Sequence, residues 1–526
     1  MAQRNRFYIT TAIAYPNGAP HIGHAYEAIA TDAIARFHRW LGEDVRFTTG
    51  TDEHGLKMEQ TGRKHGISAR EMADRMAPLF RAMDDRFNIS YDDFIRTSEP
   101  RHYASVQELW RRMAANGDIY LDRYEGWYSV RDEAYYDESE IRTADDGTKL
   151  SPQGTPVEWT VEESFFFRLS KYQQPLLDYY EAHPEFIRPE SRRNEVISFV
   201  KSGLRDLSVS RTSFDWGIPV PDAPGHVMYV WVDALTNYIT SAGFPDDASE
   251  QFRKFWPADM HVIGKDIVRF HAVYWPAFLL SAGVPLPRQV FAHGFLFNRG
   301  EKMSKSVGNV IDPMGLADLY GVDPVRYFFL REVSFGQDGS YSHEAIVTRA
   351  NAELANSFGN LAQRTLSFIV KNLEGRLPQV GEAGQPADAA LLAEVRAEGA
   401  ELERRFLDCD LSGGIEAWMR GVFACNQYID HQAPWALKKT DPARMEAVLA
   451  TLLAAIRQLA ILILPVVPDS AAKVLDQLGV AADARDRAAL DDTEWYARLT
   501  ASGFTLAAPT PVFPRLSLPP EEEVAS

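Results

Sequence analysis

Hydrophobic and polar positions alternate in blocks over the first hundred residues. The apolar run at 7–14 predicts a buried strand, a turn follows at 15–20, and the apolar spacing over 21–41 is helical. A second β-rich run at 45–49 leads into the polar sequence Gly50-Thr-Asp-Glu-His-Gly. This alternation predicts an α/β fold with a parallel sheet between helices, in which ligands bind beyond the carboxyl ends of the strands.

The pattern changes twice farther along the chain. From about 116 to 225, aromatic, acidic, glycine and proline residues dominate and helical periodicity fades, which indicates an insertion into the α/β domain. The α/β pattern resumes near 227, and after 340 nearly every segment has helical periodicity. We therefore expect an α/β domain, interrupted once, followed by a helical domain.

The composition argues against a disordered, fibrous, membrane-spanning or disulfide-stabilised protein. A chain of 526 residues with 45% hydrophobic and 24% charged residues is typical of a multidomain globular protein. The apolar stretch 459–467 is far shorter than the roughly 20 residues of a membrane helix, so we expect a cytoplasmic protein without a membrane partner. Cys409 and Cys425 form no CxxC pair, which excludes a disulfide framework or a cysteine zinc site. We expect two buried or half-buried thiols on helices.

The net charge of −18 does not exclude a nucleic-acid partner. Binding RNA requires positive potential along the contact surface, whereas global charge mainly affects solubility and non-specific association.

Two histidines lie at the predicted start of the first helix. His21-Ile-Gly-His24 follows Pro20, a residue suited to a helix start, and residues three apart share a helical face. The free backbone N–H groups and the dipole at this end favour anions, and Gly23 lets a ligand approach the backbone. Taken alone, the motif could equally be a pair of capping or surface histidines.

A basic segment lies far downstream. Lys302-Met303-Ser304-Lys305-Ser306 stands between two glycines, and its two ammonium groups and two hydroxyls suit an oligophosphate. Taken alone, such a segment is more often a solvated basic loop.

Together, and in this order, the two motifs resemble those of class I aminoacyl-tRNA synthetases; their separation is 302 − 21 = 281 residues. The resemblance implies that His21 and His24 steady the α-phosphate and ribose region of ATP, while Lys302 and Lys305 hold the departing pyrophosphate. The implied catalytic and ATP-binding set is His21, Gly23, His24, Gly264, Asp266, Lys302, Met303, Ser304, Lys305 and Ser306.

Adenylation suits these residue types. The reaction moves charge onto the α-phosphoryl oxygens and the leaving pyrophosphate, and a carboxylate needs no deprotonation near neutral pH. Positioning and electrostatic stabilisation therefore suffice. We expect Mg²⁺ to arrive with ATP rather than in an all-protein cage.

Local sequences narrow the resemblance to methionyl-tRNA synthetases, over a region from Phe7 to about Lys438. The similar segments are Thr11-Ala-Ile-Ala-Tyr-Pro-Asn-Gly-Ala-Pro-His-Ile-Gly-His, Thr49-Gly-Thr-Asp-Glu-His-Gly, Val230-Trp-Val-Asp-Ala-Leu-Thr-Asn-Tyr and Gly264-Lys-Asp-Ile-Val-Arg-Phe-His. The family implies that Asp52 pairs with the substrate ammonium and that the backbone at Ala12 and Ile13 lines the pocket. The residues implied to enclose the thioether are Tyr15, Trp231, Ala234, Leu235, Tyr238, Ile267 and His271.

A purely structural role competes for part of this set. Trp231, Leu235 and Tyr238 lie at i, i+4 and i+7, the spacing of the apolar face of any amphipathic helix. His271 could likewise be a buried histidine with satisfied hydrogen bonds.

The family also implies a fold and domain boundaries. The fold is a Rossmann-like parallel sheet with an inserted connective-peptide domain, followed by an α-helical anticodon-binding bundle. The expected parts are the first half of the catalytic domain at 1–115, the insertion at 116–225, the second half of the catalytic domain at 226–297, the basic loop with the stem-contact region at 298–345, and the helical domain with its tail at 346–526.

Many family members carry a zinc knuckle that begins Tyr-Cys-x-x-Cys. Here the matching stretch is Tyr128-Ser-Val-Arg-Asp132, in which Ser129 and Asp132 replace the cysteines. Neither side chain is a thiolate, so we expect no structural zinc.

The helical part resembles the family's anticodon-binding domain. The resemblance implies that Asn360, Arg364, Pro434 and Trp435 contact the CAU anticodon of tRNA(Met), with Trp435 stacking on a base and Asn360 and Arg364 reading base edges. The alternative is an indole buried behind Pro434 and an ordinary polar surface at Asn360 and Arg364. The chain ends soon after Pro511-Val-Phe-Pro-Arg-Leu, so we expect a monomer.

Three other functions remain open at this stage. A class I synthetase for leucine, isoleucine, valine or cysteine would share both motifs, although the insertion is short for an editing domain and the cysteine enzyme's zinc ligands are missing. A nucleotidyltransferase acting on a small metabolite would not need the helical portion. A catalytically silent tRNA-binding relative would need neither motif intact.

Overall fold

The centre of the protein is a parallel sheet. The computed structural model describes residues 5–132, 134–298, 301–302, 310–381 and 384–519. Six parallel strands follow one another in the order β3-β2-β1-β13-β14-β9. Their bounds are β1 Arg6–Thr10, β2 Asp44–Thr51, β3 Asp93–Arg96, β9 Ile187–Arg188, β13 Met260–Gly264 and β14 Val290–His293. The chain order reverses between β1 and β13, and such a switch point opens a ligand crevice at the carboxyl ends of the strands.

The first strand is shorter than its apolar run. β1 ends at Thr10, and the chain then leaves regular pairing, although Ala14 still donates to the carbonyl of Gly50 in β2 at 2.9 Å. The predicted strand at 7–14 therefore becomes a strand followed by an isolated bridge between Ala14 and Thr51. This irregular backbone faces the crevice.

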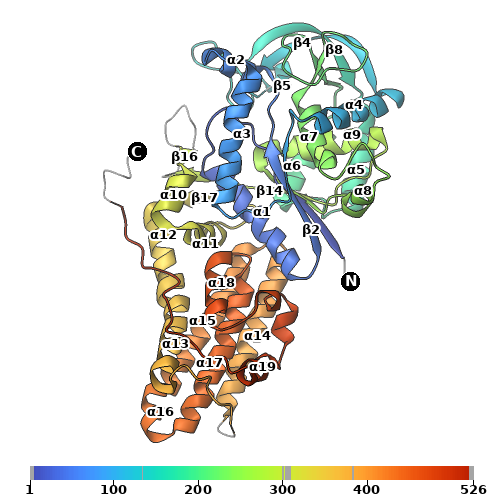
Figure 1. The fold of residues 1–526 in the computed structure, drawn as a ribbon. Coiled ribbons are helices and arrows are strands. Elements are labelled where there is room, and N and C mark those ends of the chain that lie inside the picture. Colours follow the sequence, from blue (N-terminus) through green and yellow to red (C-terminus); the bar gives the residue numbers. More distant parts are fainter. Residues whose placement is uncertain (1–4, 133, 299–300, 303–309, 382–383, 520–526) are drawn as a thin grey trace.

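Helices cover the sheet on both faces (Figure 1). The helix predicted at 21–41 is observed as α1, Ile22–Trp40, and its inward residues are buried. The other helices of this part are α2 Leu56–Lys64, α3 Ala69–Arg86, α4 Pro100–Ala115, α7 Val230–Thr240, α8 Glu250–Phe255 and α9 Trp275–Ala282.

The inserted segment forms a sheet of its own, at the opposite end of the molecule from α16 (Pro434–Thr440) (Figure 1). Its antiparallel order is β10-β8-β4-β5. The elements here are β4 Ile119–Ser129, β5 Ala134–Tyr136, β6 Arg142–Thr143, β7 Lys149–Leu150, β8 Glu158–Phe167, α5 Gln173–Ala182, α6 Glu190–Lys201, β10 Leu207–Ser208, β11 Ser210–Arg211 and β12 Val227–Met228. Between α5 and α6 the chain returns to the central sheet, where β9 pairs with β14.

A small three-stranded sheet connects the central sheet to the helical half. Its order is β16-β15-β17, and β15 follows β14 after a two-residue break. The elements are β15 Leu296–Asn298, β16 Glu301–Lys302, β17 Gly339–Tyr341, α10 Pro313–Tyr320 and α11 Val322–Glu332.

The last third is an elongated helical bundle (Figure 1). It consists of α12 His343–Arg349, the π-helix η5 Ala350–Gly359, α13 Asn360–Leu373, α14 Pro386–Leu407, α15 Leu411–Gln432, α16, α17 Pro442–Ile463, α18 Pro468–Gln477 and α19 Trp495–Ala501. Of the described helices, α17 alone is long and apolar enough to cross a membrane, and 83% of its most apolar window is buried. Packing against α14, α15 and α18 accounts for that apolar character.

Both cysteines are buried in this bundle. Cys425 lies on α15, as expected, but Cys409 stands in the turn between α14 and α15 with a φ of 61°. Burial raises the pKa of each thiol to about 12, which makes them unreactive.

One hydrophobic core continues from α1 through α11 into α15 and α17. The fully buried Arg326 of α11 lies at this junction. Its guanidinium contacts Asp32 of α1 at 2.7 Å and donates to the carbonyls of Pro465 and Val466 at 3.1 and 3.0 Å. The α/β part and the helical bundle are therefore joined by a polar contact inside a shared core.

Candidate active site and RNA-binding surface

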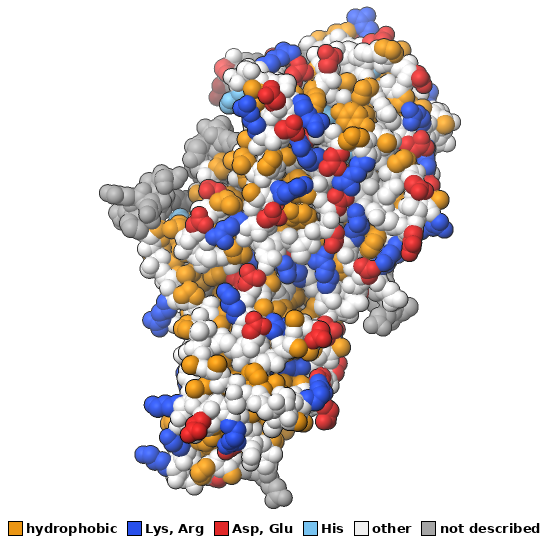
Figure 2. Space-filling model, in the orientation of Figure 1, with side chains coloured by type: hydrophobic (Ala, Val, Ile, Leu, Met, Phe, Trp, Pro, Cys, Tyr) orange, Lys and Arg blue, Asp and Glu red, His pale blue; other side chains and the backbone are white. Residues whose placement is uncertain are grey.

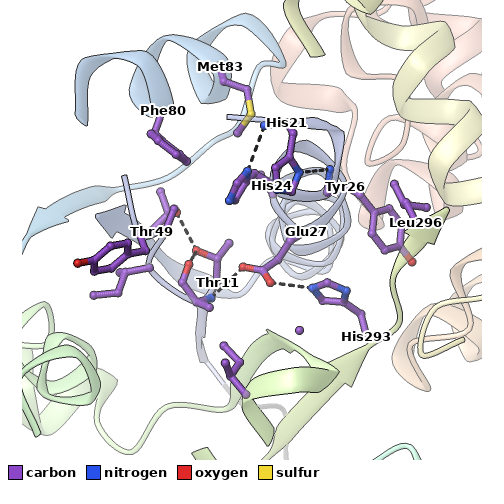
Figure 3. A pocket seen from close by; sticks show the side chains of 18 of the residues that line it. Thr11, His21, His24, Tyr26, Glu27, Thr49, Phe80, Met83, His293 and Leu296 are labelled. Carbon is purple, nitrogen blue, oxygen red and sulfur yellow. Dashed lines mark hydrogen bonds and ion pairs between the residues drawn. The ribbon is translucent and has the colours of Figure 1, made fainter. Parts of the chain in front are cut away.

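A cavity of about 360 Å³ opens at the carboxyl ends of the central strands (Figure 3). It lies at the switch point, because the segments after β1 and after β13 form two of its walls. α1 and α3 contribute further walls, and the segment from β14 to β15 closes it. Lining residues from the predicted set are Ala12, Ile13, Tyr15, His21, Gly23, His24, Gly264, Asp266 and Ile267.

The histidine turn is the N-terminus of α1. His21 is the N-cap residue, and its Nδ1 accepts the backbone N–H of Gly23 at 3.0 Å. His24 Nδ1 accepts the backbone N–H of His21 at 3.1 Å, and the two imidazole centroids are 3.9 Å apart. The histidines therefore cap the helix and project into the cavity, so the capping and ligand-binding interpretations are compatible.

These contacts determine the tautomer of each ring. An Nδ1 that accepts a backbone N–H carries no proton, so the proton of the neutral imidazole is on Nε2. Both rings thus carry an Nε2–H donor at a helix end that already favours negative charge.

Gly23 is required by this packing. A Cβ at position 23 would lie 2.8 Å from the His21 ring, closer than side chains approach in practice. A larger residue would displace the His21 ring and with it the cap of α1.

A half-buried carboxylate in the cavity was not predicted from the sequence. Glu27, one turn beyond His24, contacts His293 at the end of β14, with 2.7 Å between Oε2 and Nε2 (Figure 3). Its Oε1 accepts the backbone N–H of Ala12 at 3.1 Å. Burial alone would lower the pKa of His293, but the hydrogen bond and charge of Glu27 outweigh burial and raise it. Glu27 therefore ties α1 to the ends of β1 and β14.

Two further groups in the cavity were also missed. Thr11 donates to Thr49 at 2.7 Å across the ends of β1 and β2. Phe80, Met83 and Asp84 enter from α3, where their i, i+3, i+4 spacing is that of core residues. Burial, followed by the nearby charge of Asp85, raises the pKa of Asp84 well above its ordinary value. In the sequence, only the threonines within the apolar strand segments could have indicated that Thr11 and Thr49 face a cavity.

The basic motif itself lies outside the described residues. This applies to Met303, Ser304, Lys305 and Ser306, and to the side chain of Lys302. The flanking segments are described, and each pairs with an element that contributes to the cavity wall. On one side Lys302 pairs with Phe297 of β15, whose first residue, Leu296, lines the cavity. On the other, the carbonyl of Ile311 accepts the backbone N–H of Ile22 in the histidine turn at 3.2 Å.

The residues expected around the thioether come together behind Ile267. Ala234, Leu235, Tyr238 and His271 are buried, and Trp231 is half-buried and stacked on Phe270 with 3.9 Å between ring centroids. These five residues and Asp52 do not line the cavity as it stands in the described residues. The spacing of Leu235 and Tyr238 on α7 is consistent with a packing role, and both side chains are buried.

Tyr238 and His271 form a buried hydrogen-bonded pair. His271 Nδ1 lies 3.0 Å from the carbonyl of Ile267 and must donate to it, so Nε2 is the acceptor. The Tyr238 hydroxyl therefore donates to His271 Nε2, at 2.6 Å. Burial lowers the pKa of His271 to about 4, so the ring is neutral near neutral pH.

Asp52 follows β2 directly and is 8% exposed. Its backbone N–H donates to the carbonyl of Ala14 at 2.8 Å, which places it beside the irregular segment after β1. The neighbouring residue His54 contacts the fully buried Asp233 of α7 at 2.6 Å, and His102 of α4 contacts the other oxygen of Asp233 at 2.7 Å. The loop that carries Asp52 is thereby fixed to α7.

The predicted anticodon residues gather at one surface of the bundle. Trp435 is 47% exposed, which excludes a buried indole. The Arg364 guanidinium lies over the Trp435 ring, 5.4 Å from its centroid, and pairs with Asp430 at 3.0 Å. Asn360 is exposed one turn before Arg364, whereas Pro434 is buried at the start of α16.

The positions of the family's zinc knuckle hold a hydrogen-bonded cluster. Asp132 accepts hydroxyls from Ser151 at 2.8 Å and from Tyr136 at 3.0 Å, and also from Thr155. Ser129 is bonded to Thr155 at 2.7 Å. Within the part of the chain that the structure describes, no group of three or more His, Cys, Asp or Glu side chains is placed to hold a metal ion.

Comparisons with known proteins agree over almost the whole chain. A family model described as "tRNA synthetases class I (M)" matches residues 7–366, and one described as "Anticodon binding domain of methionyl tRNA ligase" matches 377–525. The methionine–tRNA ligase of Brucella suis is 60% identical over 512 residues, covering 97% of this chain and 98% of the relative. That of Mycobacterium bovis is 58% identical over 522 residues, covering 98% and 99%. The similarity extends well beyond Lys438.

Solved structures give the same result. A Mycobacterium tuberculosis methionyl-tRNA synthetase in complex with methionyl-adenylate matches with a TM-score of 0.93 at 56% identity, covering 97% of this chain and 100% of that one. The apo form of the M. tuberculosis enzyme matches with a TM-score of 0.86 at 53% identity, covering 98% and 99%.

Proposed function

The chain belongs to the methionyl branch of the class I tRNA synthetases, and from this premise we propose how its residues join methionine to tRNA at the expense of ATP. The enzyme is a methionine–tRNA ligase. It forms methionyl-adenylate and pyrophosphate from methionine and ATP, then transfers the methionyl group to the 3′-terminal adenosine of tRNA(Met) and releases AMP.

One observation carries the assignment of the active site. The histidine turn lines the cavity, and both ends of the segment that contains Lys302 to Ser306 pair with elements of its wall, one end with β15 and the other with Ile22 through the carbonyl of Ile311. Residues almost 300 positions apart can therefore act on one nucleotide.

In the first step the methionine carboxylate attacks the α-phosphorus of ATP, and the bond to pyrophosphate breaks. The Nε2–H groups of His21 and His24, together with the N-terminus of α1, stabilise the charge that develops on the α-phosphoryl oxygens. Lys302 and Lys305 hold the leaving pyrophosphate, and Met303, Ser304 and Ser306 belong to the same sequence motif. No side chain has to remove a proton, because the carboxylate is already ionised.

The adenosine lies against the end of β13 in this proposal. A Cβ at Gly264 would lie 2.7 Å from Asp266 Oδ1, so the glycine leaves room for that carboxylate. Asp266 is exposed and can accept a ribose hydroxyl. In this proposal Mg²⁺ arrives with ATP, because proteins usually bind it through substrate phosphates rather than in an all-protein cage.

Methionine occupies the neighbouring space between β1 and α7. Asp52 accepts the substrate ammonium, and the backbone at Ala12 and Ile13 lies along the amino acid. Tyr15, Trp231, Ala234, Leu235, Tyr238, Ile267 and His271 surround the thioether. The neutral His271 and the aromatic rings suit a polarisable, uncharged sulfur. Because five of these residues lie behind the present cavity, binding requires Trp231 or its neighbours to move.

The helical bundle reads the anticodon. Trp435 offers an exposed ring for stacking, and Asn360 and Arg364 offer donors to base edges. Pro434, which is buried, orients Trp435 from the first position of α16.

The remaining assignments follow the family. The catalytic halves are 1–115 and 226–297, the insertion is 116–225, the loop and stem-contact region is 298–345, and the anticodon domain is 346–526. A monomer in the cytoplasm is the form we propose, without structural zinc.

Pyrophosphate exchange into ATP, run separately with each amino acid, tests this function. Methionine alone should stimulate exchange. Stimulation by leucine, isoleucine, valine or cysteine instead would refute the specificity, and no exchange with any amino acid would leave only a silent tRNA-binding protein.

A further inference from the structure

The last described segment is tied along the helical bundle. Residues 505–516, here called the C-terminal strap, run beside α13 and η5 (Figure 1). The strap begins beside Gly375, whose carbonyl accepts the backbone N–H of Leu506 at 2.8 Å. It contains no helix or strand, so other contacts must hold it.

Two reciprocal pairs of hydrogen bonds hold the strap. The amide of Gln477 accepts from the backbone of Thr510 at 2.9 Å and donates back to it at 3.3 Å. The amide of Asn351 does the same for Leu516, at 2.8 and 2.9 Å. Each amide thereby satisfies one backbone N–H and one backbone carbonyl of the strap, as a neighbouring strand would. The five residues between the two anchors, Thr510 and Leu516, are therefore held at both ends.

Phe513 packs the strap against η5 between these anchors. It is 7% exposed and lies against Phe358, with 6.2 Å between ring centroids. Position 359 is glycine, and a Cβ there would be 3.3 Å from the Phe513 ring and 2.9 Å from the carbonyl of Leu354. The absent side chain allows this close approach.

The strap and the helix enclose a second cavity, of about 330 Å³. Asn356, Asn360 and Gln363 line the helical side, and residues 511–513 with Arg515 line the strap side. The volume lies in the range of small-ligand pockets, about 300–1,000 Å³. Three amides and a guanidinium can donate and accept at many points, as recognition of a nucleotide requires.

Arg515 differs from neighbouring arginines in its pairing. Arg364, Arg376 and Arg444 each contact a carboxylate at 3.0 Å or less. Arg515 is exposed, and no ion pair joins it to a carboxylate among the described residues. Basic side chains also project along this edge of the bundle in Figure 2. An exposed cation beside a polar cavity suits a phosphate group.

We propose that this cavity is a second nucleotide site for the anticodon loop of tRNA, in which Arg515 of the strap contacts a backbone phosphate and Gln363 contacts a base edge. The proposal rests on the proposed function, because Asn360 lines the cavity and lies one turn from Arg364 at the anticodon surface. The strap is then a wall of the RNA-binding site as well as a structural tie.

The test compares Arg515→Ala with a matched variant, Arg396→Ala. Arg396 is also an exposed arginine without a carboxylate partner among the described residues, but it lies on α14. We expect Arg515→Ala to raise the KM for tRNA about three- to tenfold without changing kcat. The slope of log affinity against log salt should fall by about 0.7, the contribution of one phosphate contact in single-stranded RNA. Arg515→Lys should retain the salt slope.

Methionine-dependent pyrophosphate exchange separates this proposal from the function on which it rests. Exchange should be equal in the wild type and both alanine variants. An unchanged KM and salt slope in Arg515→Ala would overturn the nucleotide site, and so would an equal effect of Arg396→Ala. A change of oligomeric state with tRNA binding intact would assign the surface to a protein and overturn the proposal as well. Absence of exchange in the wild type would instead overturn the proposed function.

Discussion

The cavity at the central sheet and the proposed anticodon surface of the bundle hold their side chains in different ways. In the cavity, His21, His24 and Glu27 are fixed by hydrogen bonds to backbone and neighbouring side chains. On the bundle, Trp435 is exposed and Arg364 is half-buried, and the contacts of Arg364 are with the Trp435 ring and with Asp430. Chemistry needs donors fixed before the substrate arrives, whereas recognition of a flexible anticodon can be completed by the RNA itself.

Both regions nevertheless share one backbone feature. A π-helical segment, η4 (Phe270–Tyr274), contains His271, which lies behind the cavity, and the π-helix η5 ends immediately before Asn360. π-helical turns are frequent at functional sites because the extra residue redirects the side chains that follow it.

The largest expected effect comes from breaking the contact that joins the two regions. Arg326→Met would leave Asp32 buried with fewer partners and the carbonyls of Pro465 and Val466 without theirs. We expect unfolding free energy to fall by about 3–5 kcal/mol, measured by urea denaturation. Arg326→Lys should be nearly as harmful, because an ammonium cannot reach the same oxygens. Wild-type stability in both variants would show that the regions fold independently.

Next in size is a catalytic effect confined to the cavity. His24→Ala removes one Nε2–H donor, and kcat for methionine-dependent exchange should fall by about 10²–10³. The KM for tRNA should be unchanged, because the anticodon surface is intact. His183→Ala, an exposed histidine on a distant helix end, is the control. A fall below tenfold would show that the histidine cap serves only the helix.

The converse variant affects only recognition. Trp435→Ala should raise the KM for tRNA about 5- to 150-fold, since stacking on one base is worth about 1–3 kcal/mol. Exchange should be unchanged, and stability should change by less than about 0.5 kcal/mol because the ring is exposed. Trp159→Ala, a similarly exposed ring in β8, is the matched control. Equal charging by the wild type and Trp435→Ala would remove Trp435 from the site.

The smallest effect is a pH dependence of the cavity's internal pairing. The folded-state pKa of His293 is raised above its ordinary 6.5 by Glu27, so the pair's ionic contribution is complete below about pH 6.5. That contribution is lost as the pH rises through the raised pKa. The stability difference between the wild type and Glu27→Gln should therefore be larger near pH 6 than near pH 9, as urea midpoints would show. A difference that grows with pH would contradict the assignment.

Local sequence patterns predicted much of this arrangement. The strands that became β1 and β2, the helix after His21 and the apolar face of α7 all follow from periodicity. Contacts between distant residues were beyond that reasoning. Glu27 and His293 are 266 positions apart, and Arg326 looks like any polar residue of an amphipathic helix. Their partners are determined by how the elements pack, which periodicity does not encode. The strap was missed for the same reason, since its hydrogen bonds replace regular structure.

The buried guanidinium of Arg326 also has a consequence for synthesis. A growing chain emerges from its N-terminus, so α1 and α11 leave the ribosome well before residues 465 and 466, which complete the shell around Arg326. Until then Arg326 lacks two of the carbonyls to which it donates in the folded protein. The nascent protein should remain dependent on chaperones and sensitive to proteases until nearly 90% of it has been translated (466/526).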